Sequence, residues 1–120
     1  MYRFPLEHTE QIIKKDLATL HIDRAGLTGA LYLTNERLVF VGYETGIVFK
    51  MVKTFSLMQI REIKAGKTMF IIPNALDITI ENNERLKIII QGRDTWLTAI
   101  REGVITAGQE QTSEGSTPVR

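Results

Sequence analysis

The sequence contains no cysteine among its 120 residues. The chain can therefore form neither disulfide bonds nor thiolate metal sites, and it fits the reducing conditions of the cytoplasm. Its two histidines, His8 and His21, are too few to predict a zinc site. A chain of this length buries enough apolar surface to fold as one domain without such cross-links.

Long apolar runs and an excess of one charge are also missing. No run approaches the roughly 20 apolar residues of a transmembrane helix, and residues 1–5 lack the apolar centre of a secretory signal. The 15 lysines and arginines outnumber the 14 aspartates and glutamates by only one. A nucleic-acid-binding protein usually carries a larger basic excess. We therefore expect no nucleic-acid partner, and any anion-binding site must be local.

Catalytic and cofactor-binding patterns are absent from the sequence as well. Neither Gly-x-Gly-x-x-Gly nor the phosphate-loop pattern occurs, and Gly66-Lys67-Thr68 matches only the end of the latter, without its upstream glycine. Both histidines have carboxylates nearby in the sequence, but nothing groups them with a nucleophile. The sequence therefore predicts a protein that is not an enzyme and that holds neither a metal nor a cofactor.

The stretch from Gly29 to Phe40 predicts a β-hairpin and is the clearest local signal. Leu31 and Leu33 share one face of its first strand, because side chains alternate along a strand. Residues 34–37 supply a polar turn, and the apolar run then resumes with residue types that suit a pleated surface.

Five further segments join the two strands of this hairpin in a pattern of short strands. The strand at 37–43 is apolar on both faces, which predicts a strand covered on two sides or a strongly curled sheet. Residues 6–15 leave two alternatives open, a short helix capped by Thr9 or a chain that leads straight into the first strand. The predicted strands span residues 17–22, 30–34, 37–43, 47–57, 60–65, 75–81 and 86–91, with turns at 23–26, 44–46 and 66–68.

The apolar period changes from two to about 3.6 after Gly92, which predicts a helix of about three turns with Asp94 as its N-cap. Its apolar stripe comprises Trp96, Leu97, Ile100 and Val104, and Trp96 is expected to anchor it in the core. Residues 108–120 are polar and aperiodic, which predicts a disordered tail. The predicted fold is all-β with one C-terminal helix, in which a seven-stranded bent antiparallel sheet or partly open barrel is capped by the helix.

Three stretches of the sequence resemble the GRAM domain, a member of the pleckstrin-homology-like superfold. They are the hairpin pattern Gly-x-Leu-Tyr-Leu-Thr-Asn-x-Arg-Leu-x-Phe at 29–40, residues 57–63, and Gly92-Arg93-Asp94-Thr95-Trp96. The resemblance covers nearly the whole chain, so we expect a GRAM domain at residues 1–107 followed by the tail, in a small stand-alone protein. In the family pattern, Arg37 is expected to have a packing or hydrogen-bonding role.

The resemblance implies a non-catalytic binding module that associates with phosphoinositide headgroups or anionic membranes, and hence a cytoplasmic protein that is peripheral at the membrane. The superfold also hosts peptide and protein binding, so the fold alone does not choose the ligand. The alternative is therefore a protein-interaction or self-assembly module, including a homo-oligomer. It would use an exposed strand edge or a groove between a strand and the last helix.

Seven basic residues are candidates for an anion or lipid site, because a cluster of them would attract an anionic membrane at about 1 kcal/mol each. In phosphoinositide-binding relatives, basic residues of the first two strands and their loop hold the phosphates. This sequence departs from that pattern, since strand 30–34 has no base. The opposing interpretation is that the charges are scattered and solvated. The candidates are Lys14, Lys15, Arg24, Lys50, Lys53, Lys64 and Lys67.

Three bulky apolar residues, Met69, Phe70 and Ile71, follow Lys67 in a predicted loop. Such a group would suit shallow insertion into a bilayer or contact with a protein partner. The alternative is that these residues begin the sixth strand, with Pro73 forcing an edge position or a bulge.

Overall fold

One antiparallel sheet contains all seven strands, in the order β4-β3-β2-β1-β7-β6-β5. The computed structural model describes residues 4–22, 25–43, 50–68 and 72–115. The strands are β1 (Ile12–Ile22), β2 (Ala25–Thr34), β3 (Arg37–Tyr43), β4 (Lys50–Ser56), β5 (Ile60–Thr68), β6 (Ile72–Ile80) and β7 (Arg85–Ile90). Two short 3-10 helices, η1 (Leu57–Gln59) and η2 (Glu81–Asn83), and the long helix α1 (Arg93–Gly115) complete the fold.

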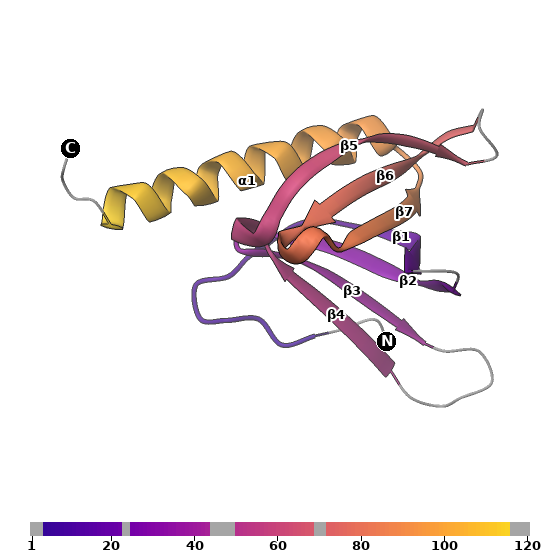
Figure 1. Cartoon of the computed structure of the whole chain (residues 1–120). Coiled ribbons are helices and arrows are strands. Elements are labelled where there is room, and N and C mark those ends of the chain that lie inside the picture. The colour runs from indigo at the N-terminus through magenta and orange to yellow at the C-terminus, as the bar shows by residue number, and fades with distance from the viewer. Residues whose placement is uncertain (1–3, 23–24, 44–49, 69–71, 116–120) are drawn as a thin grey trace.

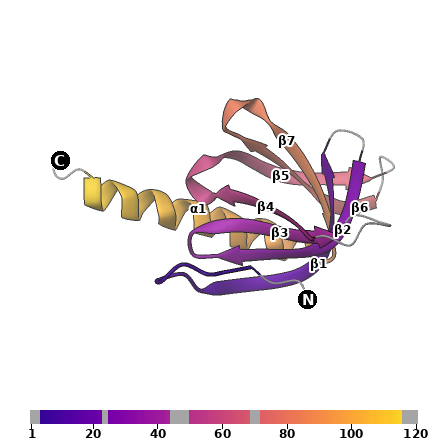
Figure 2. The same ribbon diagram turned by 90° about the horizontal axis from the view of Figure 1, so that it is seen from below.

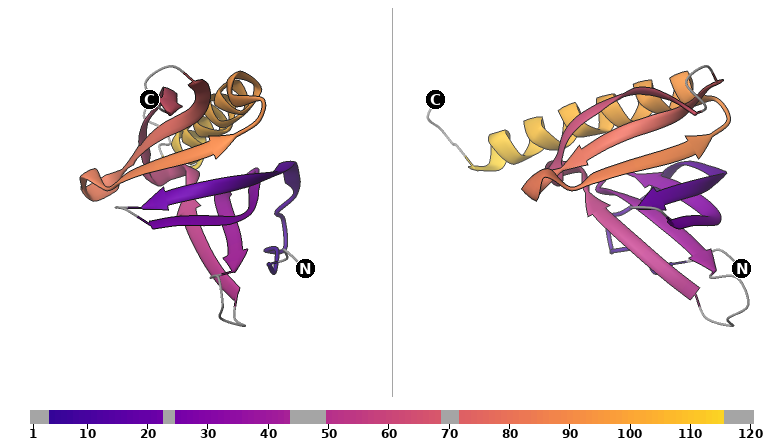
Figure 3. Two further views of the ribbon diagram at one scale, coloured as in Figure 1. Left: turned by 90° about the vertical axis from the view of Figure 1, so that its right-hand side faces the viewer. Right: turned by 45° about the vertical axis from the view of Figure 1, so that its right-hand side comes forward.

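The sheet bends strongly, so that β5, β6 and β7 form one layer and β1 to β4 form the other (Figure 3). Helix α1 runs along β5, and its C-terminal half extends beyond the strands (Figures 1 and 2). The predicted architecture of a bent seven-stranded sheet with a C-terminal helix is confirmed. No helix in the described part of the chain is long and apolar enough to span a bilayer.

Apolar side chains from both layers meet between them and form the main core. Trp96 is fully buried there, which confirms its predicted role as the anchor of α1. Its indole Nε1 donates a hydrogen bond to Asp16 Oδ2 at 2.7 Å, so the helix is attached to β1 as well as packed on it. The helix begins at Arg93, because the Gly92 carbonyl already accepts from the Trp96 backbone N–H at 3.0 Å. Asp94 is therefore its second residue and not the N-cap.

The outer face of β2 and β3 carries a second apolar cluster of Ala30, Tyr32, Val39 and Val41, all buried. Phe4 packs against this cluster, with its ring edge-on to Tyr32 and the ring centroids 4.8 Å apart. The prediction that β3 is covered on both faces is thus confirmed, because the segment before β1 folds back over the sheet.

A buried carboxylate holds that segment in place. The Glu10 side chain is fully buried and accepts hydrogen bonds from Arg37 Nε at 2.7 Å and Arg37 Nη2 at 2.9 Å. It also accepts from the Thr34 hydroxyl at 2.6 Å and from the Glu7 backbone N–H at 2.9 Å. The Arg37 hydrogen bonds outweigh the cost of burial and lower the pKa of Glu10 to about 2. Arg37 also donates to the Pro5 carbonyl at 2.7 Å, so its predicted hydrogen-bonding role is confirmed.

Asn35, in the same hairpin turn, fixes the chain just before β1. Its side-chain oxygen accepts from the Gln11 backbone N–H at 2.7 Å, and its side-chain nitrogen donates to the Thr9 carbonyl at 3.2 Å. The Asn35 backbone N–H donates to the Gln11 carbonyl at 3.2 Å. Of the two alternatives for residues 6–15, the structure has the chain leading straight into β1, which begins at Ile12.

One predicted turn, and the described part of another, lie inside strands. Gly66-Lys67-Thr68 is the end of β5, where Gly66 pairs with Ala75 and Thr68 with Ile72. Glycine allows this pairing because it has no side chain. A Cβ at position 66 would lie 2.5 Å from Asp77 Oδ2, too close for the two atoms to fit. Residues 25 and 26 belong to β2 and not to a turn. Glycine marks a close approach at position 66 rather than a change of chain direction.

The helix is longer than predicted, and residues 108–115 continue it where the sequence predicted a disordered tail. Their polar composition does not oppose a helix, and the next proline is Pro118. Residues 116–120, the predicted turn at 44–46 and residues 47–49 of the predicted fourth strand lie outside the described residues. The predicted boundary of the domain at residue 107 and the disorder of residues 116–120 stay predictions.

We expect the substitution Arg37→Met to lower the free energy of unfolding by about 3 kcal/mol near neutral pH, because it leaves a buried carboxylate without its cation. Urea unfolding measures the loss. The pKa of Glu10 is about 2 in the folded chain against 4.5 for an ordinary glutamate. The unfolded chain therefore takes up the proton first, and this stability is fully present above about pH 5 and lost as the pH falls toward 2.

The difference between Arg37→Met and the wild type should accordingly shrink when the same unfolding is repeated near pH 3. Arg61→Met, at an exposed position of β5, serves as the control and should stay within about 0.5 kcal/mol of the wild type. Equal losses for the two variants near neutral pH would contradict a stabilising Glu10–Arg37 pair.

Gly29→Ala tests the close approach of β2 to β3. A Cβ at Gly29 would lie 2.1 Å from the Val41 carbonyl oxygen and 2.7 Å from the Gly42 Cα, both backbone atoms that cannot rotate away. We expect a loss of about 3 kcal/mol in thermal or urea unfolding. Gly108→Ala, in α1 with no atom within 4 Å of its Cβ position, should instead raise stability by about 0.5–1 kcal/mol. Unchanged stability of Gly29→Ala would show that the strands can separate without cost.

Candidate functional site

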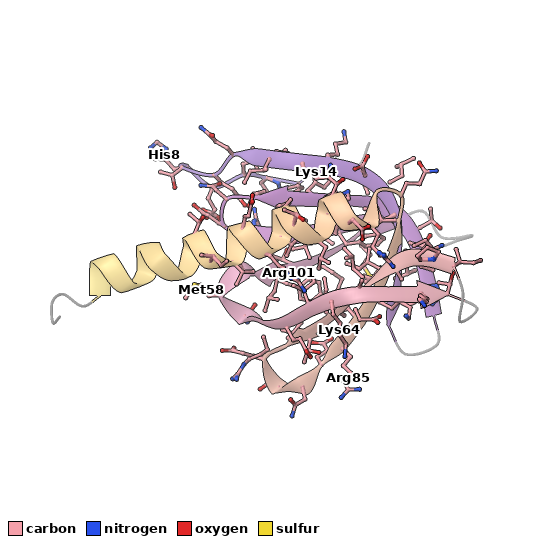
Figure 4. The ribbon with its side chains drawn as sticks, turned by 90° about the horizontal axis from the view of Figure 1, so that it is seen from above. His8, Lys14, Met58, Lys64, Arg85 and Arg101 are labelled. Carbon is pink, nitrogen blue, oxygen red and sulfur yellow. The ribbon has the colours of Figure 1, made fainter. Side chains whose placement is uncertain are left out.

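The structure distributes the predicted basic residues over several surfaces. Lys14 and Lys15 lie on β1, Lys50 and Lys53 on β4, and Lys64 and Lys67 on β5. Figure 4 shows Lys14 and Lys64 on opposite sides of α1. Arg24 and the apolar group Met69, Phe70 and Ile71 lie outside the described residues. The six described lysines therefore do not converge on one rim.

Lys64 instead joins basic residues that sequence reasoning did not select. It lines a hollow on the outer face of β5, β6 and β7, together with Arg85 and Lys87. Figure 4 shows Lys64 and Arg85 on the same side of the molecule. The strand register accounts for this, because Lys64 pairs with Asp77, Asp77 with Lys87, and Lys87 with His21.

The charges of the hollow are only partly paired. Lys87 Nζ lies 3.0 Å from Asp77 Oδ1 and donates to the Lys67 carbonyl at 3.2 Å. Among the described residues, neither Lys64 nor Arg85 makes an ion pair. Glu62 contributes a second carboxylate to the lining. The alternation predicted for β7 could have placed Arg85 and Lys87 on one outer face. Only the register of β5, β6 and β7 places them across β6 from Lys64.

A second surface of distinct chemistry lies on the outer face of β1, and we call Ile12, Ile13, Lys15 and Leu17 the β1 surface. Its three apolar side chains are exposed, with Ile13 57% and Leu17 70% accessible. Lys15 pairs with Tyr32 of the outer face, and its Nζ lies 5.5 Å from the centroid of the Tyr32 ring. Lys14 lies on the opposite face of the strand, where its Nζ is 5.4 Å from the centroid of the Trp96 ring and 3.9 Å from Asp16 Oδ2. The sequence identified both lysines, but the isoleucines, which resemble core residues, gave no sign that they lie at the surface.

Both edges of the sheet carry features that oppose pairing with another strand. At the β5 edge, two backbone carbonyls accept hydrogen bonds from side chains of α1. The Gly66 carbonyl accepts from Arg93 Nη1 at 2.9 Å, and the Ile63 carbonyl accepts from Arg101 Nη2 at 3.2 Å. At the β4 edge, Lys53 pairs with Phe40, so it lies on the face of β4 that is turned toward the core. An inward-pointing charge is a common device that prevents edge-to-edge association.

Among the described residues, no group of three histidine, aspartate or glutamate side chains could hold a metal ion.

The profile of the GRAM domain family matches residues 1–95. The chain belongs to the GRAM domain family. The segment held by Glu10, the hairpin and the full sheet all lie within the matched region.

Solved structures similar to this GRAM domain share its fold. The C-terminal domain of an unknown protein from Leishmania infantum has 18% identity and a TM-score of 0.67, covering 80% of this chain and 85% of that one. The Vps36 N-terminal PH domain has 13% identity and a TM-score of 0.67, over 88% and 86%. The hSac2 domain from human phosphoinositide phosphatase Sac2 has 19% identity and a TM-score of 0.56, over 92% and 76%.

These likenesses confirm the predicted pleckstrin-homology-like fold, a curled half-barrel with one C-terminal helix. The curated proteins contain no match to the sequence. GRAM and pleckstrin-homology-like domains are generally non-catalytic modules that bind lipids or proteins, which is the class to which the family assigns this chain.

Lys53→Val is expected to make this GRAM domain self-associate, because it replaces the inward-pointing charge of an edge strand with an apolar side chain. Sedimentation velocity over a concentration series measures the effect. We expect the average mass of Lys53→Val to rise with concentration above that of the wild type. Thr54→Val makes the same residue on the exposed outer face of β4 and should behave as the wild type does. If Lys53→Val sediments like the wild type, the β4 edge is protected by a feature other than the charge of Lys53.

Proposed function

We propose that this GRAM domain is a peripheral membrane-binding module of the cytoplasm that docks on anionic lipid surfaces through the β1 surface. The observation that supports this is the mixture of exposed apolar side chains with a lysine, Lys15, on one face of one strand. Interfacial membrane binding needs both, apolar groups that enter the headgroup region and cations that attract its phosphates.

The magnitudes fit weak, reversible attachment. Lys15 near an anionic surface contributes about 1 kcal/mol. Partial burial of Ile12, Ile13 and Leu17 adds about 1 kcal/mol each, less than the full transfer of such side chains because they already touch the protein on one side. The sum of about 4 kcal/mol corresponds to a dissociation constant of about 1 mM.

Two further observations support a lipid over a strand-pairing partner. Lys14 and Lys15 belong to β1, the strand from which lipid-binding relatives are expected to contribute basic residues. The protected edges oppose sheet extension, which was one of the two forms of the alternative function. A protein partner that binds the β1 surface itself is a further rival, and salt separates it from a lipid, because lipid attraction through surface charges is screened.

Co-sedimentation with vesicles tests the proposal, using neutral phosphatidylcholine alone and the same lipid with added phosphatidylglycerol at low and moderate salt. The wild type should pellet only with the anionic vesicles, and less as salt rises. Ile13→Ser/Leu17→Ser should weaken binding roughly thirtyfold, because it removes about two thirds of the apolar contribution. Lys15→Gln should weaken it roughly fivefold and remove most of the salt dependence.

The matched control is Ile105→Ser, which removes an apolar side chain that is 59% exposed on α1. It should bind as the wild type does. If no condition gives pelleting, or if Ile105→Ser weakens binding as much as the β1 variants, the membrane proposal is wrong.

A further inference from the structure

The hollow on the outer face of β5, β6 and β7 is separate from the β1 surface. It begins where His21 pairs with Lys87, whereas the β1 surface ends at Leu17. Four residues of strand separate His21 from Leu17, a distance of about 13 Å. The hollow therefore has its own ligand chemistry, which is independent of membrane binding by the β1 surface.

Three cations surround the hollow from two strands. Lys64 on β5 and Lys87 on β7 flank Asp77 on β6, so their Cα atoms are about 10 Å apart. Arg85 lies two residues before Lys87 on the same face of β7, roughly 7 Å away. Long side chains at these separations can reach one group placed above β6.

The carboxylates of the hollow do not cancel these cations. Asp77 is already paired with Lys87 and is pressed against the backbone at Gly66. Glu62 is then the one carboxylate in the lining that is left for Lys64 and Arg85 together. Two cations that share a single acid leave an excess positive charge, which an anion of small size would neutralise.

We propose that the hollow binds a phosphate group, held by Lys64, Arg85 and Lys87. A phosphate offers several oxygens in different directions, which suits donors that arrive from β5 and from β7. The Arg85 guanidinium can donate two parallel hydrogen bonds to two of these oxygens. The Thr79 hydroxyl supplies a neutral donor. Thr79 also lines the hollow and lies on β6, where it pairs with Glu62 of β5 and with Arg85 of β7. The phosphate belongs either to a lipid headgroup or to a soluble phosphorylated molecule.

Titration with inorganic pyrophosphate, followed by the backbone amide signals of the whole chain at constant ionic strength, tests the site. Saturable shifts are expected at Lys64, Asp77 and Lys87. Lys64→Gln/Arg85→Gln should weaken binding roughly tenfold, because both unpaired charge-assisted donors are lost. Arg61→Gln/Lys67→Gln removes two exposed charges from β5 that do not line the hollow, and it should change the affinity less than about twofold.

Glu62→Gln provides a test that misfolding cannot imitate, because it should tighten pyrophosphate binding roughly threefold by removing the opposing carboxylate. Absence of saturable binding by the wild type, or equal losses in the hollow variant and its charge-matched control, would overturn the proposal. Ile13→Ser/Leu17→Ser should leave pyrophosphate binding unchanged, so the site is tested even if the β1 surface does not bind membranes.

Vesicles distinguish the two sources of the phosphate. If vesicles with phosphatidylinositol 4-phosphate retain the wild type more than Lys64→Gln/Arg85→Gln, the phosphate is that of a lipid headgroup. If pyrophosphate binds in the hollow but these vesicles do not distinguish the two proteins, the ligand is soluble. Both results support a phosphate site.

Discussion

The fold depends on a buried carboxylate that receives four hydrogen bonds. Burying a charged group costs several kcal/mol unless its partners replace the water that it loses. Glu10 finds those partners in Arg37, Thr34 and the backbone of Glu7, which belong to the hairpin turn and to its own segment. The charge can therefore be buried only when the segment before β1 lies against the hairpin. Arg37 completes the arrangement by lying 5.1 Å from the centroid of the Phe4 ring.

That single constraint explains why β3 can be apolar on both faces. Phe40 points into the main core, while Val39 points outward and is nonetheless fully buried. Without the segment held by Glu10, Tyr32 and Val39 would lose the packing of Phe4 on the outer face. The same attachment sets the point at which β1 begins, because Asn35 binds the backbone of Gln11, the residue before Ile12.

The sequence predicts strands well where alternation is clean, as in β6 and β7, because period-two patterns depend only on local geometry. It predicts less where glycine has two meanings, and Gly66 looks like a turn residue but serves a close contact with Asp77. The candidate sites are harder still. Lys64 was identifiable as basic, but its association with Arg85 and Lys87 arises from the pairing of β5, β6 and β7. Register between distant strands is a tertiary property that no local pattern carries.

The two proposed binding surfaces are electrostatically independent, because salt screens the charges of one from the other. Electrostatic attraction between exposed charges falls off over about 8 Å at physiological salt, and Lys14 and Lys64 lie on opposite sides of α1 (Figure 4). Each ligand therefore responds to the few charges near it, and the net charge of +1 is of little consequence for either. The domain could hold a phosphate while attached to a membrane, so that two weak contacts are combined on one small sheet with neither edge in use.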